Sequence, residues 1–553
     1  METPENSTEN QAIKMEDSQT APKSLRFWLI LVALSFAGLL TSLEATITST
    51  ALPTIVASLG GEANYIWAVN GYYLATTALQ PLFGQLANIF GRRWPIIAAT
   101  ATFTLGSGIC GGAVNMAMLI AGRVIQGIGA AGINVLIDTI MCDLVPLRER
   151  GKYLGILIGM TSVGTALGPL FGGLIVAYSS WRWVFYMALP IGGAALVMLT
   201  LFLQVKYNKS NSLATNLTRI DWLGNVIFVS AVSSALIALG WAGTLYPWSS
   251  FRVIVPLILG MVGILGFVAF EASPLAPNPM MPPRLFSNRT SATAFSLTFL
   301  QSIVGMWALY FLPIYFQGSL IATASRAGIM LLPTILVVIP SAIIGGLCLS
   351  KFGQYKPIQF AAFALITIGF GLFTLLDENS STGAWVGFQI IESVGIGLII
   401  PTLLPALLAP LTDDDTALAT GAWSFIRSFG MTWGTAVPAA ILDNRASQLA
   451  SSGVIADAAV AAEFMGGGAY QHATAEYLNT LPPVTRSQVQ RLLSDSLRRT
   501  WLVAIAFAAL GFVVVGIIRE VPLRKELGGE FGIAEKLSKP EDGDGSAVQA
   551  DSC

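Results

Sequence analysis

Five ionisable side chains interrupt long apolar stretches of this chain: Glu44, Arg123, Asp138, Glu392 and Arg427. Moving an ion into hydrocarbon costs at least about 2.5–3.5 kcal/mol, so residues of this kind mark functional sites by default. A carboxylate beside a guanidinium can give up that partner when it binds a proton. Proton exchange is therefore the chemistry that this set of residues allows.

Glu44 and Arg123 are the pair best placed for this exchange. At a helical rise of about 1.5 Å per residue, Glu44 lies roughly 25 Å from the start of its apolar run and Arg123 roughly 10 Å from the start of the fourth run, which crosses in the opposite direction. Both then fall in the same half of a hydrocarbon core about 30 Å thick. A permanent structural ion pair is the alternative. Because the chain has a single histidine, His472, the proton carriers must be carboxylates.

The remaining charges allow further pairings. Asp138 and Asp143 lie near the end of the fourth run, where Arg92 or Arg93 can latch onto one of them, although simple solvation of a helix end fits equally well. Glu392 and Arg427 differ in depth by about 9 Å, which permits only weak pairing. The run Asp413–Asp415 is expected to cap the helix that follows, since anions favour a helix N-terminus.

A glycine pattern occupies one uncharged apolar stretch, Gly164-Thr-Ala-Leu-Gly168-Pro169-Leu-Phe-Gly172-Gly173. Two glycines four residues apart share one face of a helix and let another helix backbone approach closely. Pro169 removes a backbone hydrogen bond and loosens the turn before it. An ordinary close-packed membrane helix is the alternative reading of this stretch.

The composition is that of a membrane protein. Hydrophobic residues make up 54% of the chain and charged residues only 11%, whereas soluble domains carry about 25% charged residues. The formal net charge of −1 gives no electrostatic reason to expect a nucleic-acid partner. The four cysteines have no metal or redox spacing, and no phosphate-binding loop for ATP occurs. We therefore expect no metal, no cofactor and no enzymatic activity.

A membrane-spanning helix needs about 20 mostly apolar residues, and fourteen such runs can be found. They lie near 27–52, 66–87, 94–113, 117–141, 153–177, 184–204, 221–241, 253–271, 291–316, 327–350, 357–376, 384–409, 415–442 and 500–518. An even number of spans places both chain ends on one side of the membrane.

The placement of lysine and arginine predicts which side that is. Short loops after the second, fourth, sixth, eighth and tenth runs carry Arg92, Arg93, Arg148, Arg150, Lys152, Lys206, Lys209, Arg219, Arg284, Arg289, Lys351 and Lys356. Short loops on the opposite face hold only Arg182, Arg252 and Arg326. The positive-inside rule then makes both termini cytosolic. The long loop 443–499 is expected outside, with its amphipathic segment Val484–Leu497 lying along the outer surface.

Several segments resemble the fourteen-span drug:proton antiporter branch of the major facilitator superfamily, in its fungal form. The first run holds Leu43-Glu44-Ala45-Thr46-Ile47, leading to Ala51-Leu52-Pro53, which resembles the signature of that branch. The glycine pattern above resembles its antiporter motif, which is tied to export. Further similar segments are Gly84-Gln-Leu86-Ala-Asn88-Ile-Phe-Gly91-Arg92-Arg93 (the loop motif), Arg123-Val-Ile-Gln126-Gly127-Ile-Gly129 (the proton-coupling motif), Trp181-Arg182-Trp183-Val184-Phe185, Phe425-Ile426-Arg427-Ser428-Phe429-Gly430 and Leu523-Arg524-Lys525.

This resemblance covers about residues 27–533 and implies an all-α membrane protein of the major facilitator fold. It implies two six-helix bundles, two inserted helices between them, and alternating access through a central cavity. The expected divisions are a disordered cytosolic tail 1–26, an N-terminal bundle 27–204, a linker with the inserted helices 205–272, a C-terminal bundle 273–518 that includes the extracellular loop 443–499, and a cytosolic tail 519–553.

The resemblance also implies site residues. Glu44, Arg123 and Glu392 are expected to couple transport to protons, with Glu44 as the main carrier and Glu392 facing the cavity. The loop motif with Asp138 is expected to gate the cytosolic side. Asn88 replaces the usual aspartate of that motif, and Glu44 is one methylene longer than the commoner aspartate. The cavity candidates are Gln301, Trp307 and Tyr310.

The function that follows is proton-coupled efflux of hydrophobic small molecules such as toxins, secondary metabolites or drugs. Proton-driven uptake of siderophore-like compounds and a non-transporting membrane sensor are the alternatives. The glycine pattern favours export over uptake, and the buried charges disfavour a passive sensor. We expect a monomer in the plasma membrane, with the vacuolar membrane as second choice, whose partners are the substrate, protons and the lipid bilayer.

Overall fold

The computed structural model describes residues 24–59, 65–204, 213–242, 246–465 and 468–524. Within these ranges the chain is helical, and its sole extended pairing is one isolated bridge between Ala242 and Tyr246. Ten of the described helical segments are long and apolar enough to cross a membrane. Each of the fourteen predicted spans coincides with one helix or a broken pair, while the number that actually cross a bilayer stays a prediction.

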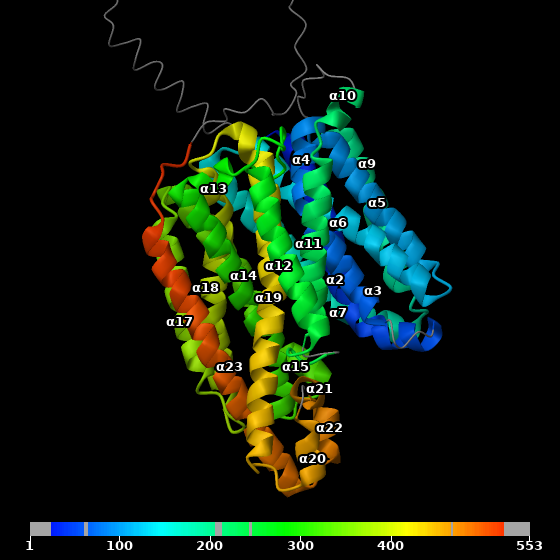
Figure 1. Cartoon of the computed structure of the whole chain (residues 1–553), viewed down its shortest axis with the longest axis vertical. Coiled ribbons are helices and arrows are strands. Elements are labelled where there is room, and N and C mark those ends of the chain that lie inside the picture. Colours follow the sequence, from blue (N-terminus) through cyan, green and yellow to red (C-terminus); the bar gives the residue numbers. More distant parts are fainter. Residues whose placement is uncertain (1–23, 60–64, 205–212, 243–245, 466–467, 525–553) are drawn as a thin grey trace, which may run out of the picture.

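The N-terminal half is a bundle of helices shown in blue to cyan in Figure 1. Its helices are α2 (Leu25–Leu59), α3 (Tyr65–Ala78), α4 (Gln80–Phe90), α5 (Arg93–Gly111), α6 (Met116–Leu144), α7 (Leu147–Tyr178), α8 (Trp183–Tyr186) and α9 (Ala188–Phe202). The predicted run 66–87 is broken between α3 and α4 at Leu79 because Pro81 stands in the first turn of α4 and cannot donate the hydrogen bond that would join the two helices.

The C-terminal half is a second bundle, green to red in Figure 1. Its helical segments are α13 (Arg284–Ser287), α14 (Arg289–Ile314), η1 (Tyr315–Ser319), α15 (Ala324–Met330), α16 (Leu332–Phe352), α17 (Lys356–Phe373), α18 (Thr382–Leu408), η2 (Asp413–Asp415), α19 (Thr416–Ser451) and α23 (Pro483–Ile517). Aromatic rings fill its core, for example where Trp501 of α23 packs on Phe370 and Phe373 of α17 at centroid distances of 6.0 and 5.3 Å.

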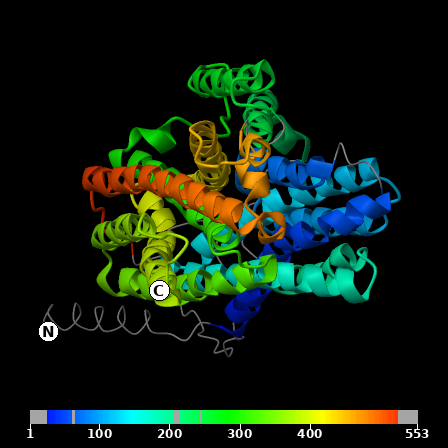
Figure 2. The same cartoon turned by 90° about the horizontal axis from the view of Figure 1, so that it is seen from below.

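Two helices stand between the halves in sequence and lie outside them in space. After the short α10 (Leu213–Thr218), α11 (Trp222–Trp241) and α12 (Phe251–Glu271) form a hairpin that projects from the bundles in Figure 2. Phe228 of α11 contacts both Phe267 of α12 and Phe425 of α19, each at 4.7 Å between ring centroids. Trp241 of α11 also contacts Trp67 of α3, at 6.2 Å between ring centroids, so the hairpin packs on both halves.

The segment 443–499 differs from its prediction. It holds the end of α19, three short helices α20 (Ala458–Glu463), α21 (Ala469–His472) and α22 (Ala475–Thr480), and the first half of α23. The segment Val484–Leu497, predicted to lie along the outer surface, forms the first part of the continuous helix α23. This segment continues without a break into the last apolar run. It is buried on one side, at Leu492, Leu493 and Leu497. The short helices α20–α22 gather beside it (Figure 1).

Both ends of the described chain lie at the same end of the bundle. Phe27 at the start of α2 packs on Tyr153 at the start of α7, with ring centroids 5.1 Å apart. The backbone N–H of Arg148, also at the start of α7, donates to the carbonyl of Arg524, after α23, at 3.2 Å. We call this the terminal end, and the end that carries α20–α22 the far end. The predicted tails 1–26 and 519–553 lie mostly outside the described residues.

Candidate functional site

Glu44 of α2 and Arg123 of α6 form an ion pair inside the N-terminal half. Arg123 Nη1 donates to Glu44 Oε1 at 3.0 Å, and neither side chain has exposed surface. The predicted equal depth of the two residues is thus confirmed by their contact. Their role in proton coupling stays a prediction.

The surroundings of Arg123 hold its guanidinium in place. Its Nε donates to the carbonyl of Ala68 at 2.9 Å and its Nη1 also donates to Gln126 Oε1 at 2.8 Å. The Cζ atom of the guanidinium lies 4.4 Å from the ring centroid of Tyr72, a distance at which a cation is attracted to the ring face. Gln126 is oriented in turn by Ser107, to which its Nε2 donates at 2.7 Å. The arginine therefore keeps several partners if Glu44 becomes neutral.

The ion pair leaves one polar atom of each partner unsatisfied. Among the described residues, Glu44 Oε2 and Arg123 Nη2 are buried and accept or donate no hydrogen bond. Unmade hydrogen bonds of this kind each cost about 1–3 kcal/mol, and more for charged groups. Glu44 therefore has an oxygen available to receive a proton without first breaking its contact with Arg123.

The glycine pattern lies in α7 and packs against α2 beside Glu44. A Cβ added to Gly168 would lie 3.0 Å from the backbone nitrogen of Ile47 and 3.0 Å from the carbonyl oxygen of Leu43. A Cβ on Gly164 would lie 3.0 Å from the carbonyl of Leu39. The expected close approach is confirmed for these two glycines. Gly168 contacts the turn of α2 that carries Glu44, and Gly164 contacts the turn before it.

The other residues of the glycine pattern do not all contribute to close helix packing. Gly172 is buried, but Gly173 is exposed and a Cβ there would meet nothing within 4 Å. The helix α7 continues unbroken through Pro169 to Tyr178. Gly173 therefore takes no part in the close helix approach made by Gly164 and Gly168.

At the terminal end the two halves are in close contact through glycines. A Cβ on Gly84 of α4 would lie 2.8 Å from the carbonyl of Ala417 and 3.1 Å from the Cα of Gly421, both on α19. A Cβ on Gly151 of α7 would lie 3.4 Å from the Cα of Gly346 on α16. Two helix crossings therefore close this end, and Gly84 of the loop motif forms one of them.

Arg148 adds a polar connection between the halves that sequence reasoning did not single out. Its Nε donates to the carbonyl of Ser350 and its Nη2 to the carbonyl of Lys351, both at 2.8 Å. These carbonyls belong to the last turn of α16, where a cation also meets the negative end of the helix dipole. In the sequence Arg148 is one of several loop cations, and its partners depend on a contact between distant segments.

The loop motif is arranged partly as expected. Arg92 Nε bonds to Asp143 Oδ2 at 2.6 Å, and Arg92 Nη1 donates to the carbonyl of Ala87 at 3.0 Å. Arg93 instead donates to the carbonyl of Thr200 at 2.8 Å. The predicted latch therefore forms to Asp143.

Gly91 and Arg92 also have roles in the backbone at the start of α5. Gly91 has φ of 77°, a conformation that disfavours residues with a Cβ. Arg92 is the N-cap of α5 and makes no side-chain cap bond.

Asp138 does not meet Arg92 or Arg93 within ion-pair distance in the described part of the chain, which corrects that option. The cation whose field acts on it is Arg427 of α19, in the other half. The guanidinium of Arg427 lies 4.5 Å from the ring centroid of Trp423. Among the described residues, Arg427 forms no ion pair with Glu392, and Asp138 is a carboxylate near enough to feel its charge.

The acidic run before α19 also has other partners than predicted. Asp415 is the N-cap of α19 but its side chain makes no cap bond. It accepts from Arg284 Nη2 at 2.9 Å, and Asp413 pairs with Arg524 Nη1 at 3.1 Å. The run therefore ties α13 and the segment after α23 to α19, in place of capping the helix.

Glu392 is buried within the C-terminal half. Its Oε2 accepts a hydrogen bond from Ser393 Oγ at 3.1 Å, and its backbone lies where α18 crosses Gly369 of α17. No cation lies within ion-pair distance of it among the described residues. It remains a candidate for proton coupling, but one without a guanidinium partner.

The three cavity candidates differ in how much of each side chain is exposed. Trp307 has no exposed surface in this structure and packs on Phe507 of α23, with 5.6 Å between centroids, so its place in a cavity stays a prediction. Gln301 is 7% exposed. Tyr310 is 43% exposed and lies near Tyr73 of α3, which is 40% exposed and donates a hydrogen bond from its hydroxyl to the carbonyl of Ala45 at 3.0 Å. Tyr73, which the sequence analysis missed, thus faces Tyr310 across the two halves.

Comparison with known proteins decides the family. The model of the Major Facilitator Superfamily matches residues 34–435. The chain belongs to this superfamily. Two solved structures share its fold: the human organic anion transporter MFSD10 (TETRAN), with TM-score 0.59 and 14% identity over 89% of this chain and 100% of that one, and the proton:xylose symporter XylE, with TM-score 0.52 and 13% identity over 84% and 98%.

Relatives in this superfamily match the chain over almost its full length. It is 56% identical to MFS-type transporter pydD of an Acremonium species, over 97% of this chain and 94% of that protein. It is 44% identical to efflux pump FUS6 of Gibberella fujikuroi and 45% identical to the acurin A biosynthesis cluster MFS-type transporter of Aspergillus aculeatus, with 94% of each chain covered. The predicted fungal form of the family is confirmed by these relatives.

Proposed function

We propose that this superfamily member exports a hydrophobic secondary metabolite across the plasma membrane in exchange for protons. The observation that carries the proposal is the full-length similarity to proteins named efflux pumps and biosynthesis-cluster transporters. The contact of Gly168 with the turn of α2 that carries Glu44 supports it further, because it ties the export-linked glycine pattern to the expected proton carrier.

In the proposed cycle the terminal end faces the cytosol and the far end faces the cell exterior. The closed glycine crossings at the terminal end and the exposed Tyr73 and Tyr310 between the halves support a conformation that opens outward. A proton arriving from outside then binds Glu44 and weakens its attraction to Arg123. Rearrangement of the halves opens the terminal end, where the proton leaves and the substrate enters.

The same proposal includes the organisation of the chain. We propose fourteen spans, with the hairpin α11–α12 as the two inserted ones, bundles at 27–204 and 273–518, and a monomer as the working unit. Hydrophobic surface suits the hairpin to lipid: Val262, Leu265 and Val268 of α12 are exposed. Each transport step moves the two halves against one another around a site near the membrane midplane.

The proposal is tested by measuring retention of a panel of fluorescent hydrophobic compounds in yeast cells that lack their own drug pumps. Cells that express the protein should retain less of at least one compound, and collapse of the proton gradient with a protonophore should abolish the difference. Greater retention upon expression would indicate uptake. Equal retention of every compound, together with no substrate-induced proton movement in vesicles, would contradict a transport role.

A further inference from the structure

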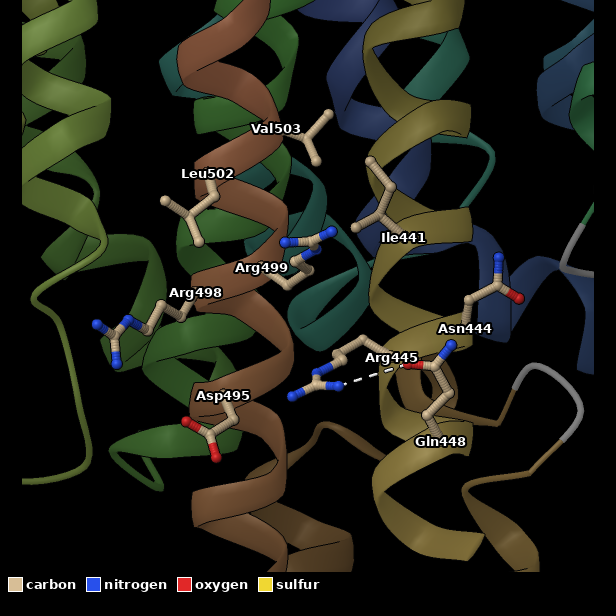
Figure 3. A pocket seen from close by; sticks show the side chains of 9 residues that line it. All are labelled: Ile441, Asn444, Arg445, Gln448, Asp495, Arg498, Arg499, Leu502 and Val503. Carbon is tan, nitrogen blue, oxygen red and sulfur yellow. Dashed lines mark hydrogen bonds between the residues drawn. The ribbon is translucent and has the colours of Figure 1, made fainter. Parts of the chain in front are cut away.

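A cleft of about 670 Å³ opens between α19 and α23 near the far end, away from the ion pair of the N-terminal half (Figure 3). Arg445 of α19 and Arg499 of α23 direct their guanidinium groups into the gap between the two helices, while Arg498 points away from it. Arg445 Nη1 donates to Gln448 Oε1 at 3.4 Å. Asp495 also lines the cleft.

Neither of the two arginines in the gap pairs with an anion in the part of the chain that the structure describes. No carboxylate within the described ranges lies at ion-pair distance from Arg445 or Arg499, although Asp495 is nearby. By contrast, Arg491, two turns earlier on α23, pairs with Glu378 at 3.3 Å. Two like charges directed into one cleft repel each other unless an anion lies between them. The cleft is therefore complementary to a negatively charged group.

The other walls of the cleft are apolar. Ile441 of α19 and Leu502 and Val503 of α23 lie on the side of the arginines that faces the terminal end, and Asp495 lies on the opposite side (Figure 3). The polarity of the cleft thus falls along the helix axes toward the interior of the bundle. A ligand that fits it has an anionic head and a hydrocarbon body.

The apolar side continues onto a surface that suits a hydrocarbon chain. Leu502, Leu510, Val513 and Ile517 are all exposed, and their spacing of eight, three and four residues places them on one face of α23. Arg499 is three residues before Leu502 and so begins the same stripe. From Leu502 to Ile517 this face extends about 22 Å, which exceeds the half-thickness of a hydrocarbon core of about 30 Å.

The depth of the arginines agrees with a lipid headgroup. The uncharged part of α23 from Thr500 to Ile517 is about 27 Å long, close to the thickness of the hydrocarbon core. Arg499 then lies at its far-end boundary, where phosphate groups lie. We propose that the cleft binds the phosphate of an anionic phospholipid from the far-end leaflet, with an acyl chain along the exposed face of α23.

The test exchanges purified full-length protein into nanodiscs of phosphatidylcholine with one fifth phosphatidylglycerol and counts retained lipids by native mass spectrometry. The wild type should retain phosphatidylglycerol above its share of the bilayer. One basic residue near an anionic surface contributes about fivefold in binding, so the double variant R445Q/R499Q should lose most of this enrichment. The matched control is R491Q, which removes one cation from the same helix outside the cleft and should keep the enrichment.

Further arms separate the possible results. R445K/R499K keeps both charges and should retain the enrichment, and thermal unfolding of each variant verifies folding. If R445Q/R499Q does not fold, R499Q alone serves as the test. Equal enrichment in wild type and the glutamine variants would overturn the proposal. Displacement of phosphatidylglycerol by millimolar inorganic phosphate would also overturn it, because the cleft would then be a site for free anions.

Discussion

Gly168 of α7 packs against the backbone of α2 at Ile47, three residues after the carboxylate that pairs with Arg123. A Cβ at position 168 would lie 3.0 Å from the Ile47 nitrogen. The glycine pattern and the buried ion pair are thus two faces of one segment of α2, with α7 on one side and α6 on the other. A shift of α7 along α2 would therefore move Glu44 relative to Arg123.

Replacing Gly168 with leucine should separate α7 from α2 and impair coupling. Overpacking of this kind typically costs about 1–3 kcal/mol, and here it displaces the turn that carries Glu44. We expect reduced export or a proton leak in energised vesicles at equal protein levels. The control is Gly173→Leu in the same helix, where an added Cβ meets nothing within 4 Å. Normal export without leak in the Gly168 variant would reduce the pattern to ordinary packing.

Glu44→Gln should preserve folding and substrate binding while abolishing accumulation driven by a pH gradient. Glutamine has nearly the same shape and can still accept from Arg123, whose other contacts to Ala68 and Gln126 remain. It cannot bind and release a proton. The measurement is gradient-driven uptake into inside-out vesicles, with Glu392→Gln as the parallel variant. If the Glu44 variant accumulates substrate fully, the carrier is Glu392 or Asp138.

Arg148→Gln should weaken the closed terminal end. The change removes two hydrogen bonds from a cation to carbonyls of α16, each worth about 1.5–3 kcal/mol for a charged group, less what partial exposure and relaxation recover. We expect the terminal end to open at least fivefold more often, read as faster labelling of a cysteine placed at Leu349 of α16, whose side chain is buried beside Gly151. Arg284→Gln is the control, because its partner Asp415 lies in the same half. Equal labelling rates would show that the glycine crossings alone hold this end.

Cysteine accessibility should separate Tyr310 from Trp307. In a variant whose native cysteines are replaced by serine or alanine, a cysteine at Tyr310 should react with a membrane-impermeant thiol reagent added from outside. A cysteine at Trp307 should react at least tenfold more slowly, because Trp307 is fully buried against Phe507. Reaction of Tyr310→Cys only from the cytosolic side would reverse the orientation proposed for the bundle.

The helical architecture was predictable from hydropathy and family motifs alone, because a bilayer imposes the same requirement at every position of a span. Backbone groups in hydrocarbon must be bonded within the segment, and so long apolar runs can only be helices. The pairing of Glu44 with Arg123 could be predicted for a related reason, since the depth of a residue in the membrane follows from its residue count along a straight helix. The breaks within helices were harder to predict. One example is the break at Leu79, where Pro81 interrupts the backbone hydrogen bonds between α3 and α4.

The side-chain partners of most other charges depended on the tertiary structure. Arg92 and Arg93 are neighbours in sequence, yet one bonds to Asp143 and the other to the carbonyl of Thr200. Trp307 and Tyr310 lie one turn apart on α14, yet the first is buried against α23 and the second is exposed toward Tyr73. Helical periodicity says which residues share a face, but the direction of that face is set by crossings between distant helices, and those arise from packing that no local pattern encodes.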